Sequence, residues 1–122
     1  MADKDNLDFE IHFYEGVIKK NPNYIDALIP LAEAYTKKGL YEKGLEIDKR
    51  LAQLCKDDSG VYYNLACSLA LVGKKKEALQ TLRQAVDLGY LDFVHLRKDP
   101  DLKSLHGHPD FEKLVDYFLK KK

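Results

Sequence analysis

LIPLAEAYTKKG, residues 28–39, is followed 34 residues later by YYNLACSLALVG, residues 62–73. The same offset aligns Leu31-Ala32 with Leu65-Ala66, Gly39 with Gly73, and Gly44-Leu45 with Ala78-Leu79. Small side chains allow two helix backbones to approach closely, and a glycine after a helix allows the chain to turn back. The sequence therefore predicts a repeated pair of helices.

The period and the matched positions resemble those of the tetratricopeptide repeat (TPR) family, whose units are about 34 residues long. The resemblance implies an all-α, helical-repeat solenoid of antiparallel helix pairs, in which each pair buries its apolar face by stacking on the next. It covers residues 7–88. After Gly89 the register fails, and the resemblance implies an irregular helical C-terminal cap, because the last repeat has no following unit to cover it.

The repeat register divides a single expected domain of 122 residues into four parts. They are an N-terminal half repeat at 7–20, a repeat at 24–56, a repeat at 59–88 and C-terminal capping helices at 89–122. We expect the first helix to begin near Leu7 with Asn6 or Asp5 as its N-cap, and the next helix to be capped by Asn23. Pro30 lies inside that second helix, where it should bend the helix or loosen its first turns.

Short apolar groups separated by helix breakers follow the second repeat. Phe93 and Leu96 predict a short helix that ends before Asp99-Pro100, and Leu102 and Leu105 predict a single turn after it. Gly107 should end that turn, and His108-Pro109 should begin a last helix. Its apolar face should consist of Phe111, Leu114, Val115, Phe118 and Leu119.

Composition argues against some classes of protein. Twenty Lys and Arg residues balance twenty Asp and Glu residues, so no overall field favours nucleic acid or an anionic membrane. The longest apolar run, from Leu65 to Val72, is far shorter than the ~18 residues of a membrane span. We therefore expect a soluble cytoplasmic protein with no nucleic-acid and no membrane partner, in which Cys55 and Cys67 are reduced and structural.

The resemblance also selects candidate binding residues, because the first helix of each TPR unit lines the concave side of the array. These candidates are Ile29, Glu33 and Lys37 in the first full repeat, and Tyr63, Asn64, Cys67 and Leu71 in the second. The helix that contains Tyr63 is apolar nearly all round, which is typical of a helix that is buried or that binds a partner. We expect this surface to receive a segment of another protein, with the Asn64 amide placed to hydrogen-bond an extended peptide.

Two interpretations of this surface remain open. In the first, Tyr63, Cys67 and Leu71 contact the partner directly. In the second, the irregular C-terminal helices fold across the groove and cover these three residues, and Asn64 caps or bridges within the array.

One specific activity is disfavoured. Some TPR proteins bind the acidic C-terminal tails of chaperones through a lysine and two asparagines on these helices. Here Asn64 matches, but Ile29 and Glu33 stand where the first lysine and asparagine are needed. Glu33 would repel a carboxylate, so the sequence argues against this class of partner.

Metal and catalytic sites have little support. His106, His108 and Asp110 are close in sequence, but no further ligands stand at a typical spacing, so a capping or surface role is favoured. Cys67 with His95 or His108 would form a nucleophile pair only if the C-terminal segment brought the two together, and no basic neighbour in sequence lowers the pKa of the thiol. We therefore expect no enzymatic activity, no metal and no cofactor.

The sequence as a whole predicts a non-catalytic protein-protein interaction module that binds a protein or peptide partner through the concave face of the repeats. The alternative is a self-associating structural module, a homo-oligomer whose groove is covered by its own C-terminal helices. Self-association in the absence of any partner would distinguish the two.

Overall fold

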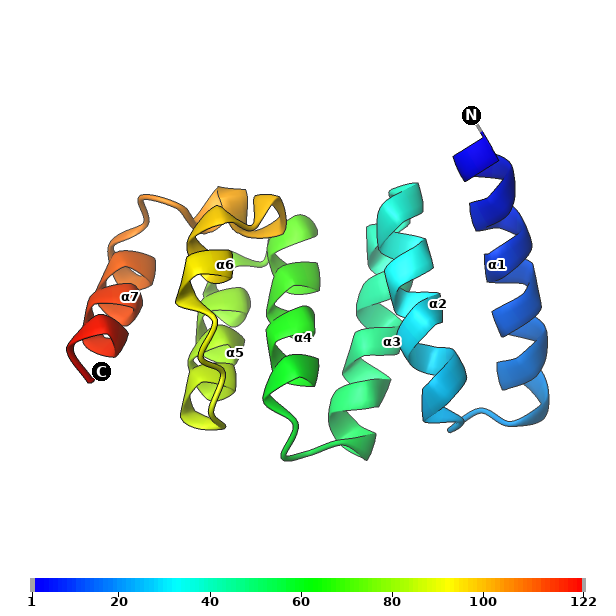
Figure 1. Cartoon of the computed structure of the whole chain (residues 1–122), viewed down its shortest axis with the longest axis horizontal. Helices are drawn as coiled ribbons and strands as arrows, with labels where there is room; N and C mark the ends of the chain where they lie inside the picture. The colour runs from blue at the N-terminus through cyan, green and yellow to red at the C-terminus, as the bar shows by residue number, and fades with distance from the viewer. Residues whose placement is uncertain (1, 122) are drawn as a thin grey trace. The chain divides into compact units, whose positions relative to one another are not determined.

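The computed structural model describes residues 2–121, and within them the side chains of 6–117, 119 and 120. All regular structure in this part of the chain is helical (Figure 1). The elements are α1 (Ala2–Lys20), α2 (Ile25–Lys38), α3 (Tyr41–Leu54), α4 (Ser59–Leu71), α5 (Lys75–Asp87), α6 (Phe93–Lys98), the 3-10 helix η1 (Pro100–Leu105) and α7 (Pro109–Lys121). The predicted all-α class is confirmed, and none of the described helices is long and apolar enough to cross a membrane.

The backbone contacts separate the chain into two compact units, Met1–Lys56 and Asp57–Lys122. The boundary falls between the two predicted repeats. Unit 1 contains α1, α2 and α3, and unit 2 contains α4, α5, α6, η1 and α7.

In unit 1, α2 packs against both α1 and α3. Leu28 and Leu31 of α2 are completely buried at the centre of this unit. A Cβ atom on Gly44 of α3 would lie 3.0 Å from the Thr36 Oγ1 atom, closer than such contacts normally come. The small residue at this repeat position is therefore required by the close approach of α3 to α2, as the sequence predicts.

Polar contacts also hold α1 to α2. The Tyr35 hydroxyl donates a hydrogen bond to the Glu15 carboxylate, and the Lys38 ammonium pairs with Asp8. Ile11 provides a buried apolar contact from α1. Among the side chains described for α1, these anchoring residues share one face of the helix.

Both repeats turn at the predicted glycine. Gly39 and Gly73 each have a φ of 86°, a left-handed conformation that costs glycine nothing and other residues appreciably. In each turn the backbone N–H of the next residue reaches back to the helix: Leu40 donates to the Tyr35 carbonyl at 2.8 Å, and Lys74 donates to the Leu69 carbonyl at 2.9 Å. The two turns are equivalent under the 34-residue offset.

The start of the first helix differs from the prediction. α1 begins at Ala2, so that Asp5 and Asn6 lie within the helix and neither is its N-cap. The sequence offered a cap residue directly before the first apolar position, but Asp and Asn are also tolerated inside a first turn, and acidic residues there are stabilised by the helix dipole.

The second helix also departs from the prediction at its start. Its N-cap is Tyr24, and no side chain caps it, so Asn23 does not have the predicted role. The loop places Asn23 inside a turn closed by a 3.1 Å hydrogen bond from the Tyr24 N–H to the Asn21 carbonyl. Pro30 does not interrupt α2, which is continuous from Ile25 to Lys38.

In unit 2, α4 and α5 form the second helix pair, and the C-terminal segment packs on it. η1 lies against α4, and α7 lies against α5. Leu96, Leu102 and Leu105 of this segment are completely buried. The residues after Gly89 are therefore part of the apolar core of unit 2.

The apolar face of α7 is shorter than predicted. Phe111, Leu114 and Val115 are buried, whereas Leu119 is exposed. Phe118 lies outside the side chains that the structure describes. Of the predicted apolar residues whose side chains the structure describes, the buried ones lie in the first two turns of α7.

Ala66 offers a test of the repeat register. It is completely buried in α4, where it is aligned with Ala32 of α2. We expect Ala66→Leu to lower the free energy of unfolding by roughly 1–3 kcal/mol, the usual cost of added volume in a packed core. Thermal unfolding followed by circular dichroism measures this loss, with Gln84→Leu on the exposed side of α5 as the control. An unchanged midpoint for the Ala66 variant would mean that the register is wrong.

Candidate functional site

The α6–η1 junction carries a carboxylate that several parts of unit 2 share. Asp99 lies between these two helices and is buried. Its Oδ2 atom accepts a hydrogen bond of 2.6 Å from the Tyr63 hydroxyl of α4. Its Oδ1 atom accepts a 3.0 Å hydrogen bond from the backbone N–H of Asp101, and this bond caps η1. One side chain thus fastens the C-terminal segment to the second repeat and begins η1.

Two further side chains contact the same carboxylate. The Cys67 Sγ atom lies 3.7 Å from Asp99 Oδ2, and the His95 Nε2 atom lies 3.2 Å from it. The Tyr63 ring stacks on the Tyr90 ring, with centroids 4.2 Å apart and planes inclined by 6°. We call Tyr63, Cys67, His95 and Asp99 the Asp99 centre.

The electrostatics of this centre oppose nucleophilic chemistry. Burial raises the pKa of the Cys67 thiol far above its ordinary value, and the nearby charge of Asp99 raises it further. Burial likewise raises the pKa of the Tyr63 hydroxyl. A nucleophilic cysteine requires a lowered thiol pKa. The structure brings Cys67 and His95 to the same carboxylate, but it keeps the thiol protonated at neutral pH.

The donor atoms of Cys67, Asp99 and Asp101 lie within 4.8 Å of one another, the spacing of a small metal site. The Asp99 oxygens, however, already accept hydrogen bonds from the Tyr63 hydroxyl and the Asp101 backbone. Burial, and secondarily the charge of Asp99, raises the pKa of the Asp101 carboxyl. The chemistry of the group fits a hydrogen-bonded structural centre.

The predicted peptide contacts of Tyr63 and Cys67 need correction. Their exposed fractions are 4% and 6%, respectively, so a partner cannot reach them in this conformation. The physical reason is the return of the α6–η1 segment onto α4, which the second interpretation of the sequence anticipated for these residues. Leu71 remains half-buried, and Asn64 is exposed on the same helix.

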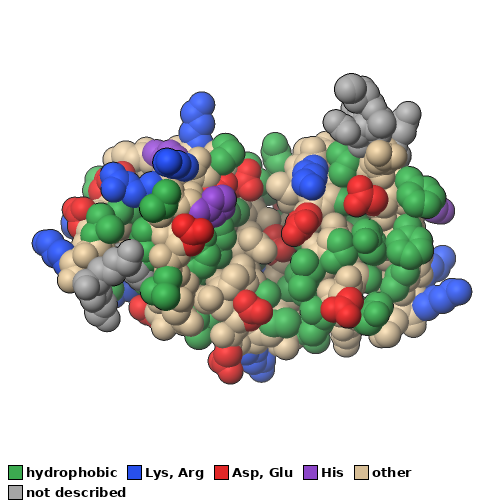
Figure 2. Space-filling model, viewed as in Figure 1, with side chains coloured by type: hydrophobic (Ala, Val, Ile, Leu, Met, Phe, Trp, Pro, Cys, Tyr) green, Lys and Arg blue, Asp and Glu red, His purple; other side chains and the backbone are tan. Residues whose placement is uncertain are grey.

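The candidates in unit 1 lie on one exposed strip of α2. Ile29 is 39% exposed, and Glu33 and Lys37 follow at intervals of four residues on the same side of the helix. We call these three residues the α2 strip. It combines an aliphatic side chain with charges of both signs, and Figure 2 shows acidic, basic and hydrophobic side chains interspersed over the face in view.

The histidine cluster near the last helix has a local structural role. The His108 Nδ1 atom accepts a 3.2 Å hydrogen bond from the backbone N–H of Asp110, at the start of α7. The His106 ring lies against the Phe111 ring, with centroids 5.4 Å apart. Neither histidine belongs to the group of metal-ligating side chains found among the described residues.

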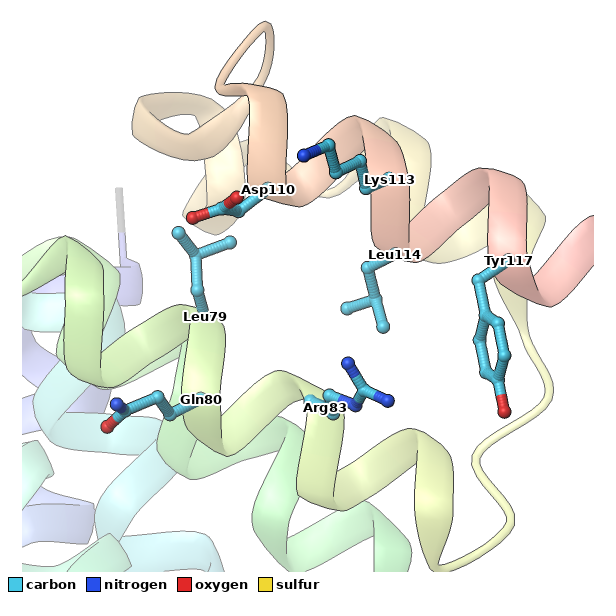
Figure 3. A pocket seen from close by; sticks show the side chains of 7 residues that line it. All are labelled: Leu79, Gln80, Arg83, Asp110, Lys113, Leu114 and Tyr117. Atoms are coloured by element: carbon cyan, nitrogen blue, oxygen red, sulfur yellow. The ribbon is translucent and has the colours of Figure 1, made fainter.

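Sequence reasoning missed a groove in unit 2 between α5 and α7. It has a volume of about 360 Å³ and is lined by Leu79, Gln80, Arg83, Asp110, Lys113, Leu114 and Tyr117 (Figure 3). The Arg83 guanidinium lies over the Tyr117 ring, 5.6 Å from its centroid. One sequence signal pointed to this groove: Leu79 aligns with Leu45 but is followed by a cap that does not keep the repeat register. In the structure Leu45 is buried, whereas Leu79 is only half-buried.

Comparison with protein families gives a match over most of the chain. The family model described as "A/B hydrolase-like, N-terminal domain" matches residues 23–122. Two curated relatives are similar in sequence. A chloroplastic protein of Arabidopsis thaliana is 32% identical over 87 residues, which are 69% of this chain and 26% of that protein. TPR repeat-containing protein YpiA of Bacillus subtilis (strain 168) is 24% identical over 98 residues, 79% of this chain and 22% of that protein.

The chain thus spans about a quarter of the length of these curated relatives. Among solved structures, a crystal structure of MamA has a TM-score of 0.77 at 23% identity, covering 98% of this chain and 70% of that one. The structure of MamA 41-end from Desulfovibrio magneticus RS-1 has a TM-score of 0.71 at 18% identity, covering 99% of this chain and 71% of that one. These likenesses show that the chain has the same helical-repeat fold.

Proposed function

The chain belongs to the A/B hydrolase-like, N-terminal domain family, and we propose that it is a non-catalytic protein-interaction module of the TPR type. It binds a segment of another protein through the exposed side of its repeat helices. Two observations support the TPR assignment: the sequence similarity to the TPR repeat-containing protein YpiA, and the fold shared with MamA.

The observation that carries this proposal is the α2 strip. α2 supplies Leu28 and Leu31 to the core of unit 1, and it still presents the large aliphatic Ile29 to solvent. Asn64, and partly Leu71, occupy the corresponding first helix of the second repeat. An exposed apolar residue flanked by charges is typical of a contact surface in which the apolar group supplies affinity and the charges supply selectivity.

A binding role also fits the chemistry of the buried polar groups. The thiol of Cys67 and the hydroxyl of Tyr63 have raised pKa values and are engaged with Asp99, so neither is prepared for nucleophilic attack. The family description refers to an N-terminal domain of hydrolase-like proteins, and we assign binding, not hydrolysis, to the residues of this chain. The partner segment is not an acidic tail, because Glu33 is exposed in the α2 strip and would repel it.

Binding by the α2 strip can be tested with a partner captured from lysate of the native organism. We expect Ile29→Glu to weaken binding at least tenfold, because it places a charge where an apolar contact forms. Isothermal titration calorimetry measures the change. Gln53→Glu on the exposed side of α3 is the matched control and should bind as the wild type does.

The charges of the strip give a second readout. Glu33 and Lys37 oppose one another in sign, so affinity should change little between low and moderate salt. Chemical-shift mapping should place the perturbations on α2. Perturbations confined to α3, or a steep loss of affinity with salt, would contradict the proposal.

A further inference from the structure

α1 exposes two large aromatic side chains on one face. Phe9 and Phe13 are 72% and 55% exposed, and they are neighbours on the helix surface at an interval of four residues. The Phe13 ring is oriented by an edge contact with Tyr14, with centroids 5.2 Å apart. Glu10 lies exposed beside this pair. We call Phe9, Glu10 and Phe13 the aromatic ridge.

The 34-residue offset identifies a residue that is equivalent to Phe13 and is buried. Phe13 aligns with Ile47 of α3, which is only 6% exposed. Gly16, one turn after Phe13, has no heavy atom within 4 Å of where its Cβ would be. The position that is buried in α3 is therefore open in α1, and the nearby backbone at Gly16 can be approached closely.

Unit 2 offers a surface that complements this ridge. The α5–α7 groove has apolar walls in Leu79, Leu114 and the Tyr117 ring. Its volume of about 360 Å³ lies at the lower end of pockets that accept small ligands, which suits one or two inserted side chains and not a whole helix. In Figure 3, Leu79 and Asp110 lie at one end of the groove and Tyr117 lies at the other, with Arg83 between them opposite Leu114.

The charges of the two surfaces are also complementary. The groove carries two cations, Arg83 and Lys113, against one carboxylate, Asp110. The ridge presents the exposed carboxylate of Glu10 beside its two rings. A phenylalanine ring of the ridge that enters the groove would contact the Tyr117 ring and the Arg83 guanidinium. The Glu10 carboxylate beside it would lie near the excess positive charge of the groove.

We propose that the chain associates head to tail with a second copy of itself, the aromatic ridge of one copy occupying the α5–α7 groove of the next. The contact is heterologous, since its two halves are different surfaces of one chain, and each copy added leaves one free ridge and one free groove. It uses neither the α2 strip nor Asn64, so it goes beyond the proposed function. The small size of the groove makes the contact weak and dependent on concentration.

Sedimentation velocity on the full chain over a hundredfold concentration range tests this association. We expect the weight-average mass to rise with concentration above the 14.0 kDa of one chain, without levelling at a dimer. Two variants interrupt the two halves separately. The ridge variant carries Phe9→Glu and Phe13→Glu, and the groove variant carries Arg83→Glu and Lys113→Glu. Each alone should associate at least tenfold more weakly.

Mixing the two variants is the decisive experiment for a contact between ridge and groove. The ridge variant keeps an intact groove and the groove variant keeps an intact ridge, so an equimolar mixture should form a 1:1 complex of twice the monomer mass and nothing larger. Lys75→Glu with Lys76→Glu makes the same charge change on exposed residues of unit 2 and should leave association unchanged. Circular dichroism confirms that each variant is folded.

Three results would overturn the proposal. The wild-type chain could remain monomeric at every concentration, which would mean that ridge and groove do not bind each other. The mixed variants could fail to form the 1:1 complex, which would place any self-association on another surface. The Lys75 and Lys76 control could lose association as completely as the groove variant, which would show a general charge effect.

Discussion

Removal of residues 89–122 is expected to abolish the cooperative unfolding of unit 2 and to cause aggregation. The segment contributes seven buried apolar side chains: Phe93, Leu96, Leu102, Leu105, Phe111, Leu114 and Val115. Each fully buried apolar side chain contributes about 1.5–3 kcal/mol, so the combined loss of roughly 10–20 kcal/mol is as large as the whole stability of ~5–15 kcal/mol that is usual for a domain. The truncation would also expose the apolar flank of α4, including Tyr63.

Chemical denaturation followed by circular dichroism, together with light scattering, measures this effect. A truncation that removes only residues 120–122, three lysines, is the control and should unfold as the wild type does. A soluble, monomeric and cooperatively unfolding 1–88 fragment would show that the C-terminal segment is an appendage and that the second repeat is stable without it.

Asp99→Ala is expected to destabilise unit 2 by roughly 2–4 kcal/mol. The substitution leaves the buried Tyr63 hydroxyl without its acceptor, which costs about 1–3 kcal/mol. It also removes the side-chain cap of η1, which contributes about 1 kcal/mol in a typical helix. Both losses fall on one residue because its two oxygens serve different elements.

The Asp99 prediction has two matched comparisons. Tyr63→Phe removes one partner and should cost less than Asp99→Ala, and in the double variant the two effects should not add, since the residues share an interaction. Asp92→Ala removes an exposed cap of α6, whose side chain accepts a 3.0 Å hydrogen bond from the His95 N–H, and should cost only about 1 kcal/mol. Equal destabilisation by Asp99→Ala and Asp92→Ala would contradict a shared role for the buried carboxylate.

The Asp99 centre has a consequence for function. Because it draws the α6–η1 segment onto α4, Tyr63 and Cys67 serve the fold, and of the candidate residues on α4 only Asn64 and the half-buried Leu71 keep exposed surface. In unit 1 no such segment returns onto α2 among the described residues, and Ile29 is exposed there. The proposed binding surface is therefore defined partly by what the C-terminal segment covers.

The candidate site was only partly predictable from sequence. The periodicity around Tyr63 correctly indicated a helix with more apolar surface than one packing face needs. It could not indicate the covering element, because the hydroxyl acceptor lies 36 residues later in an irregular segment. The α5–α7 groove was missed for a related reason: it depends on how far α7 stands from α5, which no local pattern encodes.

The sequence by itself determined the helical-repeat class, the two turns at Gly39 and Gly73, and the interruption at Asp99-Pro100. These features are local: small residues permit close helices, glycine permits a positive φ, and an aspartate followed by a proline caps and begins a new helix. Only the tertiary structure decided that Tyr63 and Cys67 are buried and that Phe9 and Phe13 are exposed. Periodicity identifies an apolar face. What covers that face depends on contacts between segments that are distant in sequence, and these contacts form only when the chain folds.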